Sequence, residues 1–332
     1  MLEKEEQMEI PPDLAKLIAI KNSMNEKALE EFTEKKSREG ISVSEALKNN
    51  DFKLIIELSR YQTKYIALNM YGPLPDEVKC ELTNADGVAA EWITNPNVVT
   101  DQILFHLFGG GYVMGTLETR RRNPFLLGRE SKLRCLNIGY RLAPEHPFPA
   151  ALDDSIKAYR WLLSTGITPE NVVFSGASAG GGLAIATLLK LRELGVPLPA
   201  AAVLLSPWVD LALTGDSLKT NAKFEPNITK GMLRGCAMAY LRGKEPKNPL
   251  ASPLYADLKG LPPMLIQAGN IEVLLDDSVR LAEYAKASGV KVKLEVWKGM
   301  THVFQSFGDS LADSRQAIEN VGKFIQKTLR QE

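Results

Sequence analysis

Residues 172–181 read Val172-Val173-Phe174-Ser175-Gly176-Ala177-Ser178-Ala179-Gly180-Gly181. An apolar run typical of a strand leads into Gly-x-Ser-x-Gly, and a helix-like segment follows. A nucleophilic serine needs this order, because its hydroxyl must project from a sharp turn at the end of the sheet. The small residues beside Ser178 let the strand and the helix approach closely, and the helix would point its positive end at the reacting centre. The run therefore predicts attack by Ser178 on a carbonyl.

The chain after residue 75 alternates strand-like and helix-like segments. Strands are expected at 78–82, 89–94, 103–107, 133–140, 172–175, 201–206, 264–268 and 292–297. Helices are expected at 149–163, 183–194 and 277–288. This alternation predicts an α/β protein with an eight-stranded, mostly parallel sheet and helices on both faces. The first two strands lack an intervening helix, so we expect them to pair antiparallel at one edge.

Two segments depart from this alternation. Residues 1–70 show apolar residues at helical spacing in stretches separated by polar loops. Residues 208–250 disperse large apolar side chains among Gly, Pro, Asn and Lys. We expect both segments to be helical and to cover the active site as a cap, while residues 71–207 and 251–332 form the catalytic domain.

The composition of the 332 residues excludes several classes of protein. Lys+Arg and Asp+Glu are both 40, and this balance argues against nucleic acid or an anionic membrane as a partner. Three scattered cysteines without a C-x-x-C disfavour a disulfide framework or a metal site. Met1–Glu9 is acidic and lacks the apolar core of a secretory signal, so we expect a cytoplasmic protein. The tight basic cluster Arg120-Arg121-Arg122 is interpreted as a solvated helix face.

A serine of this kind needs a carboxylate and a histidine, which follow it along the chain in that order. Of the three histidines only His302 follows Ser178. It lies just beyond the last expected strand, at the sheet edge where α/β proteins bind ligands. Glu272 lies in a loop at the same edge, whereas Asp276 and Asp277 resemble residues of a first helical turn. We predict that Glu272 orients His302, with Asp276 as the alternative.

A glycine run follows the third expected strand and suggests an oxyanion hole. Gly109-Gly110-Gly111 precede Tyr112. Glycines let main-chain N–H groups turn toward a ligand without a clash from Cβ, although a flexible loop would have the same composition. We predict that the N–H groups of Gly110 and Gly111, with that of Ala179, bind the developing oxyanion.

Several longer motifs in the chain are specific enough to indicate a protein family. They comprise residues 109–115 (GGGYVMG), 140–154 (YRLAPEHPFPAALDD), 176–181 (GASAGG), 206–208 (SPW), 272–277 (EVLLDD) and 302–304 (HVF). Through them, most of residues 75–325 resembles the bacterial hormone-sensitive-lipase-like esterases, often called family IV. The resemblance implies an α/β-hydrolase fold with a helical cap, hydrolysis of short- to medium-chain esters, no cofactor, and frequent dimers. It supports Ser178, Glu272 and His302 as a triad and a structural role for His146 and Asp154.

One position departs from the family pattern. The family motif places a histidine directly before the three glycines, and this chain has Phe108 there. Phenylalanine cannot form the hydrogen bonds with which that histidine fastens the loop. His106, two residues earlier on the same face of the strand, would partly compensate. We hypothesise that Phe108 loosens or reshapes the loop without abolishing catalysis; the alternative is that its ring simply packs beneath the loop.

These observations predict a serine carboxylesterase that acts on a small-molecule ester through an acyl-enzyme, without a cofactor or a metal. Phe108, Tyr112 and Trp208 are expected to shape the substrate pocket. A non-catalytic small-molecule receptor on the same fold is the alternative, although such receptors usually lose the histidine. Amide or lactone hydrolysis would use the same machinery. Neither nucleic acid nor a membrane is expected as a partner, and the resemblance is compatible with a homodimer.

Overall fold

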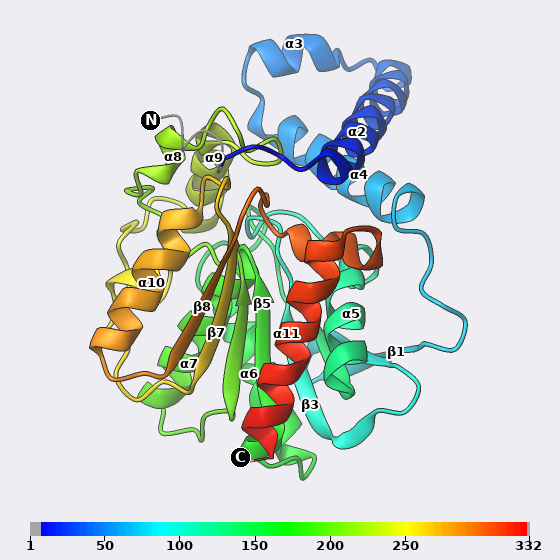
Figure 1. Ribbon diagram of the computed structural model, residues 1–332. Coiled ribbons are helices and arrows are strands. Elements are labelled where there is room, and N and C mark those ends of the chain that lie inside the picture. Colours follow the sequence, from blue (N-terminus) through cyan, green and yellow to red (C-terminus); the bar gives the residue numbers. More distant parts are fainter. Residues whose placement is uncertain (1–7, 331–332) are drawn as a thin grey trace.

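The computed structural model describes residues 8–330, and its centre is one sheet of eight strands (Figure 1). The strands are β1 (Lys79–Ala85), β2 (Val88–Thr94), β3 (Val99–Leu107), β4 (Leu133–Gly139), β5 (Val172–Ala177), β6 (Ala201–Leu205), β7 (Met264–Gly269) and β8 (Val292–Trp297). Their order in the sheet is β1-β2-β4-β3-β5-β6-β7-β8. β2 pairs antiparallel with β1 and β4, and the other pairs are parallel. The predicted sheet and its antiparallel edge are confirmed.

Helices cover both faces of the sheet (Figure 1). One face carries α6 (Ala150–Ser164), α7 (Ala179–Glu193) and α10 (Leu275–Ala287), and the other carries α5 (Arg122–Ser131) and α11 (Ala312–Leu329). Strand β6 shows why both layers are needed. Ala202 and Leu204 pack into the first layer, whereas Val203 and Leu205 pack into the second, because successive side chains of a strand point to opposite faces.

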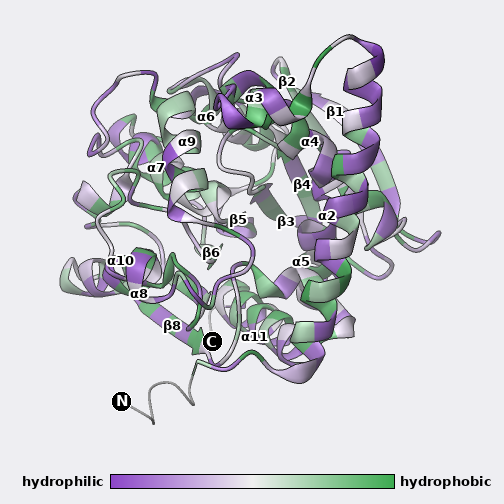
Figure 2. Cartoon of the chain, turned by 90° about the horizontal axis from the view of Figure 1, so that it is seen from above, coloured by the Kyte–Doolittle hydropathy of each residue, from purple (hydrophilic) through white to green (hydrophobic). Residues whose placement is uncertain are grey.

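Further helices of the described chain lie beyond the carboxyl ends of the parallel strands, and we call them the cap helices. They are α2 (Pro12–Arg38), α3 (Val43–Lys48), α4 (Phe52–Asn69), α8 (Ser217–Thr220) and α9 (Lys230–Leu241). Seen from above, α2 and α4 lie on one side of the central strands and α8 and α9 on the other (Figure 2). Short 3₁₀ turns occur at η1 (Glu118–Arg120), η2 (Pro169–Asn171), η3 (Pro253–Tyr255) and η4 (Phe304–Ser310).

Polar caps set the starts of the shorter cap helices. The Ser42 hydroxyl accepts from the N–H of Glu45, and the Asp51 carboxylate accepts from the N–H of Leu54. The expected cap segment begins at residue 1, but residues 1–7 lie outside the described residues. The expectation that the chain lacks a secretory signal was also based on these residues. Within residues 8–330, every helix is too short or too polar to cross a membrane.

Two apolar clusters hold the N-terminal cap helices in place. Phe32, Val43 and Leu54 pack together between α2, α3 and α4. Leu14 from α2 packs instead on the segment that follows β8, against residues that include Phe304. The first helix is thus fixed to the main body as well as to its neighbours.

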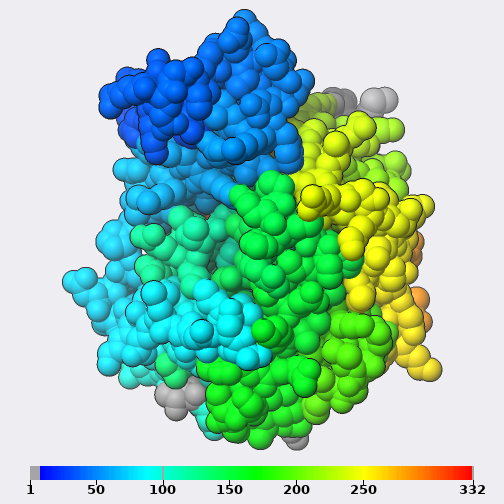
Figure 3. Space-filling view, turned by 180° about the vertical axis from the view of Figure 1, so that it is seen from behind, coloured from blue at the N-terminus to red at the C-terminus, as the bar shows by residue number. Residues whose placement is uncertain are grey.

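Arg60 of α4 makes a polar connection between the cap and the body. Its guanidinium donates to the carbonyls of Val113 and Ala143, over 2.8 and 3.1 Å, and pairs with both oxygens of Glu145 at 2.7 Å. Figure 3 shows the N-terminal cap helices, in blue, resting on the rest of the protein. The hydrogen bonds of Arg60 lower the pKa of Glu145 to about 2, so the pair stays charged at neutral pH and is lost only in strong acid.

We expect Arg60→Ala to lower the free energy of unfolding by about 1–3 kcal/mol, because two main-chain carbonyls lose a charged donor. The ion pair itself is half exposed and contributes little of this. Urea denaturation measures the change. Arg60→Lys, which keeps the charge but not the forked donor, should recover only part of it. Unchanged stability of Arg60→Ala would show that the connection does not hold the cap.

Candidate active site

Ser178 lies between β5 and α7 in a backbone conformation that few residues other than glycine adopt. Its φ is 53° and its ψ is −123°. The N–H of Ser178 donates to the carbonyl of Leu205 over 2.9 Å, and its own carbonyl accepts from the N–H of Trp208 over 3.0 Å. The neighbouring strand β6 and the loop after it therefore hold the strained turn in place.

Two glycines make this turn sterically feasible. A Cβ on Gly176 would lie 2.3 Å from the carbonyl oxygen of Gly180, and a Cβ on Gly180 would lie 2.0 Å from the carbonyl oxygen of Leu107. Neither distance is sterically allowed, so both positions require glycine. The prediction that small residues let β5 and α7 approach closely is confirmed.

His302 and Glu272 meet at the carboxyl edge of the sheet, after β8 and β7. Nδ1 of His302 lies 2.6 Å from Oε2 of Glu272, and Oε1 of Glu272 accepts from the N–H of Gly269 over 2.8 Å. The Glu272 side chain is fully buried, and that of His302 is 8% exposed. A buried carboxylate held at both oxygens favours the tautomer with its proton on Nδ1, which leaves Nε2 as the basic nitrogen.

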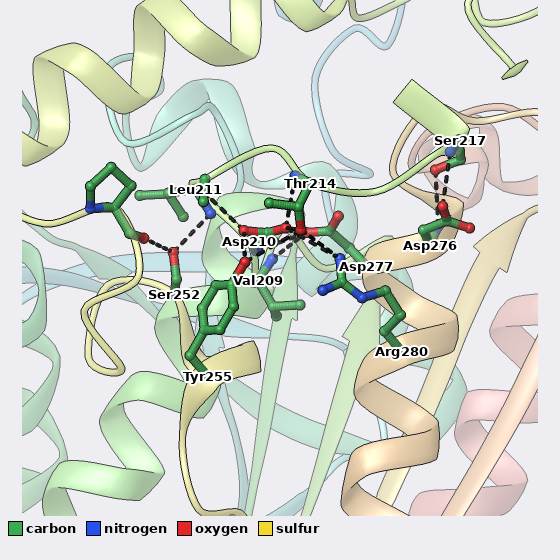
Figure 4. Close-up of polar contacts among 12 residues, drawn as sticks. Val209, Asp210, Leu211, Thr214, Ser217, Ser252, Tyr255, Asp276, Asp277 and Arg280 are labelled. Carbon is green, nitrogen blue, oxygen red and sulfur yellow. Dashed lines mark hydrogen bonds and ion pairs between the residues drawn. The ribbon is translucent and has the colours of Figure 1, made fainter. Parts of the chain in front are cut away.

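The alternative acid, Asp276, is engaged elsewhere (Figure 4). Its Oδ2 accepts from the N–H of Ser217 over 2.8 Å. The neighbouring Asp277 accepts from the N–H groups of Val209 and Asp210, over 2.8 and 2.9 Å. These aspartates hold the segment that leaves β6 for the cap, and Glu272 is the carboxylate that contacts His302.

The glycine loop after β3 offers main-chain donors next to the serine turn. The carbonyl of Gly110 accepts from the N–H groups of Val113 and Met114, over 3.1 and 3.0 Å, which closes the loop on itself. None of the hydrogen bonds found among residues 8–330 uses the N–H of Gly110, Gly111 or Ala179. These three N–H groups are therefore available to a ligand oxygen.

Ser178, His302 and the glycine loop all border one cavity of about 310 Å³. Cap helices supply much of the remaining wall, including Ile66 of α4 and Met232 of α9. The structure thus brings the serine, the histidine and the glycine loop to a common space, with Glu272 buried directly behind the histidine. This arrangement suits nucleophilic attack on a carbonyl.

Of the three aromatic residues expected in the pocket wall, only Phe108 borders the cavity. Its ring stacks on Tyr140, with centroids 4.5 Å apart, and the Tyr140 hydroxyl donates to the Phe108 carbonyl over 2.7 Å. Tyr112 and Trp208 are fully buried away from the cavity, and Tyr112 stacks on Tyr240 at 3.8 Å. These two rings turn into the apolar core beneath the loop because their large surfaces are better buried there.

His106 is buried on β3 and also borders the cavity. Its Nδ1 lies 2.8 Å from the hydroxyl of Ser175 on β5. Burial lowers the pKa of His106 to about 3, so the ring is neutral. The expected compensation for Phe108 is not made, because the hydrogen bond of His106 runs to a strand and not to the glycine loop.

We expect Phe108→His to lower the free energy of unfolding by about 1–3 kcal/mol, because a polar ring would replace an apolar ring stacked on Tyr140. The rate of turnover should fall severalfold, since the glycine loop begins at the next residue. Urea denaturation and kcat and KM on one substrate measure both effects. Phe108→Leu is the control that keeps an apolar side chain. Unchanged kcat and KM in Phe108→His would show that this side chain does not shape the loop.

Glu225, in the segment between α8 and α9, is a site residue that the sequence did not reveal. Its Oε2 accepts from the main-chain N–H of His302 over 2.9 Å, and its Oε1 accepts from the N–H of Asn227 over 2.7 Å. Burial raises the pKa of Glu225. The contact joins residues 77 apart in the chain, and no motif or spacing connects them.

The interpretation of Arg120-Arg121-Arg122 as a solvated helix face is wrong. Arg121 forms an ion pair with the fully buried Glu91. Arg122 donates to the carbonyl of Ser306 over 3.3 Å, and Arg120 borders the cavity. The chain passes here from η1 into α5, so the three consecutive side chains point in different directions: Arg121 toward Glu91, Arg122 toward Ser306 and Arg120 into the cavity wall.

His146 and Asp154 lie apart from the cavity. Both Asp154 oxygens accept from the guanidinium of Arg141, at 2.7 to 3.0 Å, and one also accepts from its N–H. His146 is exposed. The structural role expected for Asp154 is confirmed by this pairing.

Known proteins resemble this chain in sequence and in structure. A family model described as the alpha/beta hydrolase fold matches residues 104–306. An acetyl-hydrolase from Streptomyces hygroscopicus is 44% identical over 237 residues, which cover 71% of this chain and 79% of that protein. An esterase from Acinetobacter venetianus is 38% identical over 224 residues, 67% of this chain and 74% of its own. The crystal structure of an esterase from the bacterial hormone-sensitive lipase family superimposes with a TM-score of 0.81 at 46% identity, over 82% of this chain and 92% of that one.

Proposed function

This chain belongs to the alpha/beta-hydrolase-fold family of bacterial esterases, and we propose that Ser178, Glu272 and His302 are its catalytic triad. The chain is a serine carboxylesterase. One observation carries the assignment of the triad: Ser178 and His302 border a single cavity, and a buried Glu272 holds Nδ1 of that histidine.

The proposed reaction passes through an acyl-enzyme. Nε2 of His302 takes the proton of the Ser178 hydroxyl while the Ser178 oxygen forms a bond to the ester carbonyl carbon. The N–H groups of Gly110, Gly111 and Ala179 donate to the oxyanion of the tetrahedral intermediate. His302 then gives the proton to the departing alcohol oxygen. Water attacks the acyl-enzyme by the same route and releases the carboxylic acid and free Ser178.

The buried carboxylate of Glu272 acts at the step in which His302 becomes positively charged. Glu272 stabilises the imidazolium that forms on His302 and keeps the ring oriented toward the serine. Glu225 is a positioning residue in this scheme, because its carboxylate fixes the main chain of His302 from the cap side.

We infer that residues 1–70, of which 8–70 are described, and residues 208–250 act as the cap of the enzyme, over a catalytic domain of residues 71–207 and 251–332, described as far as residue 330. Thr63 and Ile66 of α4 and Met232 of α9 border the cavity opposite the sheet. A volume of about 310 Å³ and a wall that includes apolar side chains such as Ile66 and Met232 support short- to medium-chain acyl groups. A homodimer and a cytoplasmic location stay predictions.

A substrate-length series tests the proposed function. Rates on p-nitrophenyl esters from acetate to decanoate should be highest for the short and medium chains, and an uncharged fluorophosphonate should label Ser178. Matched p-nitroanilide and lactone substrates report amide and lactone hydrolysis. Binding of an ester without hydrolysis and without a label would contradict the proposal and favour the receptor interpretation.

A further inference from the structure

The cavity wall carries three cationic side chains and no carboxylate. Lys21 of α2, Arg120 at the end of η1 and Arg122 at the start of α5 all border the cavity, whereas no Asp or Glu of the described chain does. Most of the remaining wall is apolar or uncharged. A pocket for purely apolar ester substrates has no use for this concentration of positive charge.

Two of these cations have partners within the protein. Nζ of Lys21 donates to the side-chain oxygen of Asn227 over 2.6 Å, and Lys21 also interacts electrostatically with Glu225. Burial lowers the pKa of Lys21 to about 8, which leaves it mostly protonated at neutral pH. Arg122 donates to the carbonyl of Ser306, and its guanidinium lies over the ring of Tyr71 at 5.5 Å.

The side chain of Arg120 has neither a hydrogen-bond acceptor nor a carboxylate partner among residues 8–330. Its Nε is buried without a hydrogen-bond acceptor, and no carboxylate pairs with its guanidinium. The side chain packs against Gly115, where a Cβ would lie 3.0 Å from Nε. An arginine stays charged in a protein, and the half-buried side chain of Arg120 loses part of its hydration without gaining a counter-ion. An anion on the ligand would supply the missing partner.

We propose that Arg120, assisted by Lys21, binds a carboxylate carried by the substrate, so that the preferred substrates are esters with a free carboxylate elsewhere in the molecule. The planar guanidinium matches a carboxylate in two-point hydrogen bonding. The ester bond would lie at Ser178 and the charged end at the cationic part of the same cavity. The inference rests on the proposed function, because it concerns which ester the triad receives.

The test compares two substrates that differ only at the far end of the acyl chain. Monoethyl adipate ends in a carboxylate, and ethyl hexanoate ends in a methyl group. Release of acid, followed in a pH-stat at neutral pH, gives kcat/KM for each. We expect the wild-type enzyme to have the higher kcat/KM on monoethyl adipate. A ratio below one for this pair, together with a ratio below one for the alcohol-side pair described below, would overturn the proposal without any variant.

Variants then assign the preference to the residue. Arg120→Met should lower kcat/KM for monoethyl adipate about 10- to 100-fold, mainly through KM, and at least tenfold more than for ethyl hexanoate. Lys21→Met should cause a smaller selective loss. The matched control Arg160→Met removes an exposed arginine from α6 and should change neither substrate. Equal losses on both substrates, or none, in Arg120→Met would overturn the assignment.

Two further measurements distinguish a failure of this inference from a failure of the proposed function. A butyrate ester of 4-hydroxybutanoate carries the carboxylate on the alcohol side, and its ratio to butyl butyrate shows which half of the ester faces Arg120. A preference for neither charged ester overturns the proposal. Hydrolysis of ethyl hexanoate and labelling by an uncharged fluorophosphonate report the esterase itself. If these fail in the wild-type enzyme, it is the proposed function that is wrong. Arg120→Lys, which keeps the charge, serves if Arg120→Met does not fold and should retain part of the preference.

Discussion

A Ser178→Ala variant is expected to lose about 10⁵- to 10⁶-fold in kcat on p-nitrophenyl butyrate, because the bond-forming oxygen is removed while the rest of the site remains. The residual rate would come from the oxyanion donors and from substrate binding. Alanine fits the turn at 178, since the surrounding main chain and not the hydroxyl holds that conformation. Initial rates and fluorophosphonate labelling both measure the loss.

A matched control separates this effect from the substitution itself. Ser164→Ala removes an exposed hydroxyl at the end of α6, where it bonds only to the carbonyl of Trp161, and should leave kcat and labelling unchanged. Thermal unfolding should show that Ser178→Ala is folded. Full activity in Ser178→Ala would contradict the assignment of the nucleophile.

The second large effect concerns the carboxylate behind the histidine. Glu272→Gln is expected to lower kcat about 10³- to 10⁴-fold with little change in KM. In the variant the amide oxygen can keep the hydrogen bond from Gly269, which turns the amide N–H toward Nδ1 of His302. The ring would then carry its proton on Nε2, and Nε2 could no longer accept the proton of the serine.

Asp276→Asn is the control for this experiment because Asp276 was the alternative acid. Its carboxylate accepts from the N–H of Ser217 and not from the histidine. An asparagine oxygen can still accept that bond, so kcat should fall less than tenfold. A larger loss of kcat in Asp276→Asn than in Glu272→Gln would show that Asp276, and not Glu272, is the carboxylate that acts with His302.

Much of the sheet could be predicted because its strands are short apolar runs that alternate with helical spacing. Two helices were not predicted, α5 and α11, although Ile318, Val321 and Ile325 of α11 recur at helical spacing. Helix α7 begins at Ala179, directly after the serine as the Gly-x-Ser-x-Gly run indicates, whereas the helical spacing was expected only from residue 183. The run Gly180-Gly181-Gly182 has a poor helix propensity, but close contacts with Leu107 and the loop after β6 override it.

The candidate site likewise contains residues that the sequence predicts and residues that it does not. Ser178, Glu272 and His302 could be proposed because each follows a strand, and strand ends of a parallel sheet share one edge. Glu225 and Lys21 could not, because their positions relative to the site depend on how the cap packs. Arg120 drew attention only as part of a basic cluster, and the direction of its side chain is set by the turn before α5.

The hydrogen bond between Glu225 and the main chain of His302 constrains how a substrate enters. Glu225 belongs to the insertion between β6 and β7, so an outward rotation of that whole segment would remove a hydrogen bond that supports His302, the proposed general base. We therefore expect that opening of this part of the cap would also disturb the alignment of His302 with Ser178, and that turnover needs residues 221–227 in the position described here.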